Sequence, residues 1–320
     1  MQPLKFNHIL KSKIWGGERI SSFKKLSSKQ QHVGESWELS GLKGYESVVA
    51  DGTHAGKTIT EVLRIEKEKL LGKENYRKCG NEFPLLVKLI DAKSQLSVQV
   101  HPNNEQAQLC GMRNGKSEMW YVMDAERDAS LWVGLKKKIS QEQCKKMLTD
   151  HTIVDAMDKY PVKSGDCFYI PGGRIHSIGA GTFLAEIQQS CDVTYRIYDF
   201  DRQDKDGNKR QLHTSEALNC LDYNVLPNYK TYYEEADNKA CRMVNSPFFK
   251  TSVYKVTKPL SVDLSPIDSF VIWIGIEGSS QLKDNEGNVF SFSEGETILI
   301  PATTQKIEIE EPMKFLQVFI

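Results

Sequence analysis

Two stretches, one near the middle of the chain and one near its end, share the same pattern. Residues 162–178, VKSGDCFYIPGGRIHSI, and residues 292–309, FSEGETILIPATTQKIEI, both contain a glycine, an acidic residue, three further residues and then Ile-Pro. The glycine predicts a turn, the apolar residues a short strand, and the proline a point where strand pairing stops. A unit repeated once at this distance indicates duplicated β domains rather than a solenoid.

Most of the chain outside the repeat has the pattern of short β-strands. Its apolar and β-branched residues alternate or cluster in short runs that turn residues bound, which is typical of strands. These runs cover residues 84–92, 96–102, 118–125, 130–135, 166–171, 181–189 and 194–200. Many short strands at this spacing indicate a sandwich or barrel, so we expect a mainly β fold.

Two segments break the strand pattern and predict helices near residues 57–80 and 140–160. The first has apolar residues among charges and ends in glycine. The second begins with Ser140, which Gln143 follows three residues later in a capping-box pattern. We interpret both as helical additions to the N-terminal part. The domain boundary is placed in an Asn/Tyr/Lys-rich stretch, which gives domains of residues 1–238 and 239–320.

Charge and cysteine content exclude several functional classes. The 42 basic and 42 acidic residues balance, so nothing indicates a bulk attraction to nucleic acid or to an anionic membrane. The seven cysteines form no CxxC pair, which fits reduced cytosol better than a disulfide framework or a thiolate zinc cluster. No signal-peptide core is present, and no apolar run approaches the roughly 20 residues of a membrane span. We expect a cytoplasmic monomer or weak homodimer without nucleic-acid or membrane partners.

The run LSVQVHPNN, residues 96–104, places a glutamine and a histidine two residues apart among apolar residues. Because side chains alternate along a strand, Gln99 and His101 point the same way, while Val98 and Val100 point to the other face. One face is then built for packing, and the other offers an amide oxygen beside an imidazole nitrogen. A half-buried strand with an incidental polar face would give the same pattern, so other parts of the chain must decide.

The repeated unit resembles the glycine–acidic–proline motif of cupins, which are small jelly-roll barrels. In metal-binding cupins the last residue of this motif is a histidine ligand, and His176 stands there, whereas the second copy has no histidine. The resemblance implies two cupin-type jelly-roll barrels, the second without metal. Gln99, His101 and Glu118 could supply the other ligands. Such an N₂O₂ set suits Zn²⁺ or another divalent first-row ion, so we expect one divalent metal per chain, with Zn²⁺ as the first choice.

The chain further resembles class I mannose-6-phosphate isomerases of the short bacterial type. The matching stretches are KIWGG, VGESWELSG, LSVQVHPNNEQA, GKSEMWYVMDA and FYIPGGRIHSIGAGTFLAEIQQSCDVTYRIYDFDR, spread over residues 13–202. The resemblance implies a metal-dependent isomerase that interconverts mannose 6-phosphate and fructose 6-phosphate by proton transfer through an enediol(ate). The family's site residues fall on the metal ligands Gln99, His101, Glu118 and His176, the catalytic Arg196, and the substrate contacts Ser97, Lys116, Asp192 and, where longer members have a lysine, Arg202.

The residue types fit the chemistry that this activity requires. Aldose–ketose isomerisation needs a polarised carbonyl, a proton transfer between C2 and C1, and stabilisation of the enediol(ate) between them. On a strand, Arg196 would share a face with Thr194 and Tyr198, as an interior-facing arginine needs. The phosphate requires arginine or lysine together with hydroxyl donors. The general base stays open between Asp192, Lys116 and a hydroxide on the metal.

Two alternatives from other functional classes remain. Two histidines and a glutamate resemble the metal triad of iron oxygenases, although Gln99 as a fourth ligand speaks against this type of cupin enzyme. The other alternative is a non-catalytic regulator that binds sugar phosphates, since a fold does not by itself imply activity. Turnover of mannose 6-phosphate without oxygen, after metal reconstitution, separates the three.

Overall fold

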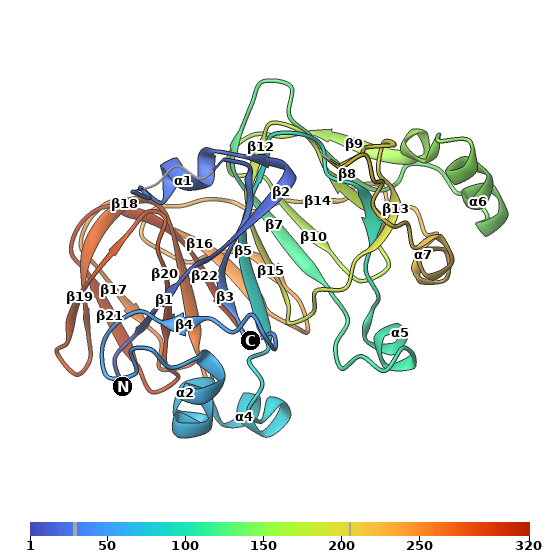
Figure 1. The fold of residues 1–320 in the computed structure, drawn as a ribbon. Coiled ribbons are helices and arrows are strands. Elements are labelled where there is room, and N and C mark those ends of the chain that lie inside the picture. Colours follow the sequence, from blue (N-terminus) through green and yellow to red (C-terminus); the bar gives the residue numbers. More distant parts are fainter. Residues whose placement is uncertain (28–30, 205) are drawn as a thin grey trace.

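The computed structural model describes residues 1–27, 31–204 and 206–320, which form two barrel-like β units side by side (Figure 1). In these residues a seven-stranded and a five-stranded sheet build the first unit, and a ten-stranded sheet builds the second. The ladders are antiparallel. This architecture confirms the mainly β fold that the sequence pattern predicts.

The strands of each sheet come from distant parts of the chain. In spatial order, the seven-stranded sheet contains β14 (Lys230–Thr231), β10 (Cys167–Ile170), β7 (Glu118–Ala125), β12 (Thr182–Gln189), β5 (Leu85–Ala92), β2 (Ile9–Gly17) and β3 (Val33–Ser40). The five-stranded sheet contains β13 (Tyr195–Tyr198), β6 (Val98–Val100), β11 (His176–Ile178), β8 (Ser130–Leu135) and β9 (Met157–Pro161). The ten-stranded sheet follows the path β15 (Cys241–Asn245), β16 (Lys250–Val256), β22 (Met313–Phe319), β18 (Val271–Asp284), β20 (Thr297–Ile300), β1 (Leu4–Asn7) and β4 (Val48–Val49), with β17 (Leu260–Asp263), β19 (Val289–Ser293) and β21 (Lys306–Ile309) off this path.

The strands predicted from the sequence are confirmed, with small changes at their ends. Residues 118–125 and 130–135 form β7 and β8 over their full predicted lengths. The predicted strand over residues 96–102 is shorter and forms β6, and the one over residues 194–200 forms β13.

The predicted helix over residues 57–80 is broken into three. Its pieces are α2 (Ile59–Glu66), α3 (Glu68–Leu71) and α4 (Lys73–Cys79), and the breaks fall at Lys67 and Gly72, where φ is positive. The carbonyls of Leu70 and Leu71 accept hydrogen bonds from backbone N–H groups of the second unit rather than from a continuing helix. Docking against the second unit therefore interrupts residues 57–80, although their sequence pattern predicts one helix.

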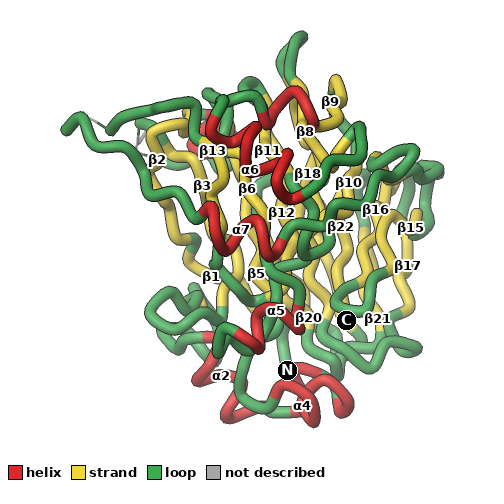
Figure 2. The backbone as a smooth tube through the Cα atoms, turned by 90° about the vertical axis from the view of Figure 1, so that its right-hand side faces the viewer, coloured by secondary structure: helices red, strands yellow, loops and turns green. Residues whose placement is uncertain are grey.

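The predicted helix over residues 140–160 also ends early. It forms α6 (Gln141–Thr149) and a 3₁₀ turn, η1 (Ile153–Ala156), and the residues that follow belong to β9. The predicted capping box of Ser140 with Gln143 is confirmed. Three further short helices, α1 (Arg19–Phe23), α5 (Asn104–Leu109) and α7 (Thr214–Cys220), lie outside the strand layers (Figure 1). Figure 2 shows α5 and α7 from a second direction. None of the helices in the described ranges is long and apolar enough to cross a membrane.

Both copies of the sequence repeat form the same turn. Gly165 and Gly295 have φ values of +90° and +80°, a conformation that residues with a Cβ rarely adopt. The acidic residues that follow them, Asp166 and Glu296, each accept a hydrogen bond from the backbone N–H three residues earlier, at 3.1 and 2.9 Å. The acidic position of the repeat therefore closes the turn before the strand begins.

The same two carboxylates also hold a neighbouring strand in each unit. Asp166 pairs with Lys230 of β14, and Glu296 pairs with Lys5 of β1, both at 2.7 Å. Strand β14 lies beside β10, just as β1 lies beside β20 in the second unit. The first strand of the chain therefore completes the second unit and crosses the domain boundary expected near residue 238.

Strands β5, β7 and β12 are buried on both faces, and this positions the site. Alternate residues such as Val87, Tyr121 and Ile187 join a hydrophobic cluster that also contains Ile272 and Leu316 of the second unit. The residues between them face the interior of the first unit. Because one sheet face is covered by the second unit, the other face is free to carry polar side chains into an enclosed space.

The second unit has an apolar interior. Strand β18 divides its residues 271–274 between the shared cluster and this interior, so both of its faces are buried there. Large side chains such as Trp273, Phe292 and Phe315 fill the interior. At the start of β21, where the repeat places the counterpart of His176, the chain has Lys306, which is exposed.

Candidate active site

Three of the predicted metal ligands converge inside the first unit. His101 follows β6, Glu118 begins β7 and His176 begins β11, so the group draws on both sheets. All three side chains are buried, and their ligand atoms lie within 4.8 Å of one another. Strand pairing sets this arrangement, because His176 is directly opposite Gln99 of β6.

The hydrogen bonds of the two histidines direct one nitrogen of each ring toward Glu118. His101 Nδ1 lies 2.9 Å from the backbone oxygen of Val193, and His176 Nδ1 lies 2.8 Å from that of Arg174. A carbonyl oxygen can only accept, so Nδ1 carries the proton and Nε2 keeps a lone pair. Burial and the Lys116 ammonium lower the pKa of His101 well below its ordinary value, and burial lowers the pKa of His176 to about 3. Both rings are therefore neutral, as metal ligands must be.

Glu118 is the buried carboxylate of this group. Both carboxylate oxygens are buried, and neither accepts an aligned hydrogen bond from any residue that the structure describes. Burial and the charge of Glu186 raise the pKa of Glu118 to about 7. The Lys116 ammonium lies 3.0 Å from Glu118 Oε2 and 2.9 Å from His101 Nε2. The space between the two side chains therefore favours a positive charge. Two neutral imidazoles around a buried carboxylate fit a divalent cation.

Gln99, the fourth predicted ligand, lies beside this group. Its amide nitrogen lies 3.2 Å from His176 Nε2, which places the amide at the edge of the His–Glu–His group. Val98 and Val100 point away from it into a separate hydrophobic cluster. The alternation predicted for residues 98–101 is therefore present in the structure.

A cavity of about 300 Å³ opens beside this group, between the two sheets of the first unit. Its walls come from β2, β3, β5 and β12 on one side and from β6, β11 and β13 on the other. Five of the residues expected at the site line it, namely Ser97, Gln99, Lys116, Asp192 and Arg196. Gln99 and Lys116 connect the cavity to the buried metal-ligand group.

Arg196 faces the cavity from β13, directly opposite Gln99 of β6. Its Nη1 donates to the backbone oxygen of Gln211 at 2.9 Å, and its Nε is buried without a hydrogen-bond partner among the described residues. Thr194 shares the cavity as expected, but Tyr198 does not, because the register shifts between Arg196 and Tyr198. A β-bulge redirects the chain at this point.

Of the residues predicted for catalysis and substrate contact, Arg202 is the one that the structure places outside this cavity. It lines a neighbouring cavity, pairs with Asp199 and donates to the backbone oxygen of Gln95. Arg210, which the sequence analysis did not single out, lines both cavities.

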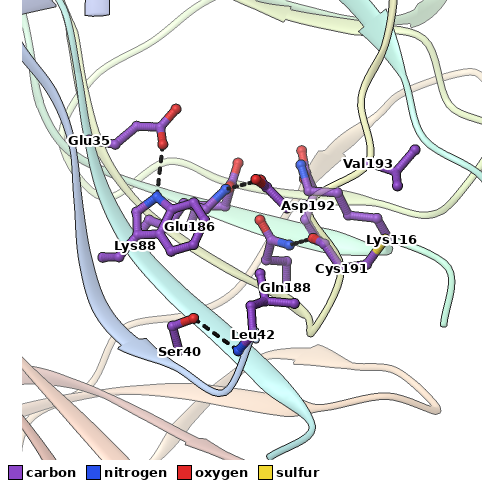
Figure 3. Close-up of polar contacts among 12 residues, drawn as sticks. Glu35, Ser40, Leu42, Lys88, Lys116, Glu186, Gln188, Cys191, Asp192 and Val193 are labelled. Atoms are coloured by element: carbon purple, nitrogen blue, oxygen red, sulfur yellow. Dashed lines mark hydrogen bonds and ion pairs between the residues drawn. The ribbon is translucent and has the colours of Figure 1, made fainter. Parts of the chain in front are cut away.

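A buried row of polar residues on the opposite wall was also missed. Lys88 of β5 and Glu186 of β12 are direct partners in the ladder and form an ion pair of 3.1 Å. Trp120 of β7 donates its indole N–H to the same carboxylate at 3.0 Å. Figure 3 shows Lys88 reaching toward Glu186 and Asp192, and the distance from Lys88 Nζ to Asp192 Oδ1 is 3.9 Å. The available signal was a charged residue in the middle of each of two mostly apolar strands.

The charges in this row fix one another. Burial alone would raise the pKa of Glu186, but the Lys88 ammonium overrides it and lowers the value to about 2. Burial alone would lower the pKa of Lys88, but Glu186 and Glu35 raise it above its ordinary range. Glu35 in turn pairs with Lys13 at 3.3 Å and accepts the indole N–H of Trp37 at 2.8 Å. The wall therefore carries fixed charges at neutral pH.

Comparison with known proteins gives consistent results. The family described as phosphomannose isomerase type I, catalytic domain, matches residues 3–128. The mannose-6-phosphate isomerase ManA of Bacillus subtilis is 31% identical over 312 residues, which cover 97% of this chain and 96% of that protein. The mannose-6-phosphate isomerase of Streptococcus mutans is 32% identical over 316 residues, 98% of this chain and 97% of its own. The crystal structure of the mannose 6-phosphate isomerase from Bacillus subtilis superposes over 100% of both chains, with a TM-score of 0.90 and 27% identity.

Proposed function

The chain belongs to the type I phosphomannose isomerase family, and from this premise we propose that it interconverts mannose 6-phosphate and fructose 6-phosphate in the cavity beside His101, Glu118 and His176. The observation that carries the proposal is the buried His–Glu–His group, which opens to a cavity with fixed charges. An apolar pocket could bind a sugar ring, but it could not stabilise the charges that an isomerase creates.

The metal of this proposal is one Zn²⁺ per chain, held by His101, Glu118, His176 and Gln99. Imidazole, carboxylate and amide oxygen are ligands that zinc accepts, and a site without thiolate that stays open on one side is typical of catalysis. A bound divalent metal supplies Lewis-acid polarisation of the substrate carbonyl and its neighbouring hydroxyl.

Arg196 is proposed to stabilise the negative charge that develops on the enediolate. It lies beside Gln99, and no carboxylate among the described residues forms an ion pair with it. A guanidinium stays charged at neutral pH, and its fixed fork needs no reorganisation when the oxyanion forms. The buried, unpartnered Nε is available for this contact.

We assign the transfer of the proton between C2 and C1 to Asp192, which would act as the general base. Glu186 is a poor candidate, because a carboxylate with a pKa near 2 is a weak base at neutral pH. Asp192 lines the same cavity, and the Lys88 ammonium lies 3.9 Å away, where it can compensate the carboxylate charge. Asp192→Asn should lower kcat by about 10²–10⁴-fold with metal content unchanged, and an unchanged kcat would remove Asp192 from this role.

The test of the function is turnover of mannose 6-phosphate by the metal-reconstituted protein, in air and under strict exclusion of oxygen. An isomerase gives equal rates in both, whereas an oxygenase-type cupin enzyme is active only in air. A sugar-phosphate-binding regulator would bind the substrate without turnover. Either of these two results would overturn the proposal.

A further inference from the structure

One part of the cavity wall is formed by β13 and the segment that follows it. Arg196 of β13 is tied to this segment by two hydrogen bonds, from its N–H to His213 Nδ1 at 3.3 Å and from the His213 N–H to its backbone oxygen at 2.8 Å. Arg210 and His213 both line the cavity together with Arg196. We call Arg196, Arg210 and His213 the basic end of the cavity.

The lysines of the cavity are already neutralised within its walls. Lys88 pairs with Glu186 at 3.1 Å, and Lys13 pairs with Glu35 at 3.3 Å. Lys116 lies 3.0 Å from Glu118 at the metal-ligand group. Their positive charges therefore have carboxylate partners before any substrate enters.

The basic end has an excess of positive charge. The buried Asp199 carboxylate accepts a hydrogen bond from Arg210 Nε at 2.7 Å and forms an ion pair with the same guanidinium. It also forms an ion pair with Arg202. One carboxylate therefore faces two guanidinium groups, and Arg196 adds a third positive charge nearby. Burial and the proximity of Arg210 both lower the pKa of Arg196, as expected for neighbouring cations. A dianion would relieve this repulsion.

Position along the cavity separates the two arginines that line it. Arg196 is directly opposite the metal-ligand residue Gln99, so it is the member of the basic end that lies beside the metal-ligand group. Arg210 also lines the neighbouring cavity, which Arg196 does not, so it lies where the two cavities adjoin. A substrate whose carbonyl is at the metal-ligand group therefore extends its other end toward Arg210.

We propose that Arg210, oriented by Asp199, binds the 6-phosphate of the substrate, and that Arg202 acts only by holding Asp199. This inference rests on the proposed function, because that function makes the ligand a sugar phosphate. A guanidinium held by a buried carboxylate presents its remaining N–H groups in a fixed direction, which suits bidentate contact with phosphate. Arg202 has no such freedom, since its groups are engaged by Asp199 and by the backbone oxygens of Gln95 and Asp199.

The experiment compares Arg210→Ala with Lys209→Ala as a matched control. Lys209 is the adjacent residue and carries the same charge, but it pairs with the exposed Asp201 and does not line the active-site cavity. Arg210→Ala should raise KM for mannose 6-phosphate by about ten- to a hundredfold and leave kcat nearly unchanged. Inorganic phosphate, used as a competitive inhibitor, should lose affinity by a similar factor. Lys209→Ala should change neither value, and Arg210→Lys should fall between Arg210→Ala and the unmodified protein.

Direct binding of inorganic phosphate, measured by calorimetry, separates this inference from the proposed function. If the unmodified protein binds phosphate and Arg210→Ala does not, the inference holds even where no isomerase activity is found. Unchanged phosphate affinity in Arg210→Ala, with a native circular dichroism spectrum, would overturn it. A larger rise in KM for Arg202→Ala than for Arg210→Ala would overturn it as well, because Arg202 would then be the phosphate contact.

Discussion

Arg196 lies at the centre of the site, opposite Gln99 and without a carboxylate partner among the described residues. If it stabilises the enediolate, its removal acts on the transition state more than on the bound sugar. Arg196→Ala should therefore lose about 10²–10³ in kcat, or ~3–4 kcal/mol, with metal content intact and a modest change in KM. Steady-state kinetics with metal analysis on each preparation checks this. Near-normal kcat with a greatly raised KM would mean that Arg196 is a binding residue instead.

The ionisation of Glu186 makes the free energy of unfolding depend on pH in the acid range. Its pKa in the folded protein is about 2, below the ordinary value of 4.5, so the ionised carboxylate stabilises the fold above about pH 4.5. This contribution is lost as the pH falls from 4.5 toward 2. Over that range the free energy of unfolding should fall more steeply for the unmodified protein than for Glu186→Gln. Urea unfolding at several pH values measures both slopes, and parallel curves would contradict the assignment.

Local sequence was enough to predict some site residues but not others. His101, Glu118 and His176 lie in sequence motifs whose residue types and positions predict a metal site. Lys88 and Glu186 lie in different strands, 98 positions apart, and become partners only because β5 and β12 are neighbours in the sheet. No local pattern contains that adjacency, so the pair could be found only from the structure.

At the scale of single elements, α6 begins where its sequence says that it should. The Ser140 side chain accepts from the Gln143 N–H at 3.1 Å, and the Gln143 side chain accepts from the Ser140 N–H at 2.8 Å. Ser140→Ala should remove about 1 kcal/mol of local helix stability. Hydrogen exchange of the first-turn amides should then be about fivefold faster, and catalytic constants should stay the same. Ser140→Asp, which keeps a cap, serves as the control; equal exchange in all three proteins would show that the cap contributes nothing.

The helix over residues 57–80 could not be predicted in detail, for a physical reason. Its apolar and charged residues follow a helical pattern, but the carbonyls of Leu70 and Leu71 bond to the second unit. Tertiary hydrogen bonds outweigh local propensity here, as they do at the β13 bulge that turns Tyr198 away from the cavity. Elements stabilised by their own residues were therefore predicted better than elements shaped by docking.

At the scale of the whole molecule, the second unit supports the first. One hydrophobic cluster runs through both, and β1 pairs with β20 across the expected boundary. A chain truncated after residue 238 would expose this cluster, remove the β20 partner of β1 and aggregate. Gel filtration and activity of the truncated chain test this prediction. A soluble and fully active truncated protein would show that the second unit has no supporting role.

The sequence repeat predicted two related units but not how they share strands. Asp166 and Glu296 occupy equivalent positions, yet one pairs with Lys230 of β14 and the other with Lys5 of β1. Which distant strand completes each sheet depends on the full packing of the molecule, which a linear pattern does not contain.

The central claim is that one metal ion at His101, Glu118 and His176 carries the isomerase activity. The most direct measurement titrates Zn²⁺ into the chelator-treated protein while bound metal and mannose 6-phosphate turnover are recorded together. We expect the apoprotein to stay folded but inactive, and activity to rise in proportion to bound metal up to one equivalent per chain. The double variant His101→Ala, His176→Ala should bind no metal under the same conditions. Full activity in the metal-free protein, or a full equivalent of metal in the double variant, would contradict the account.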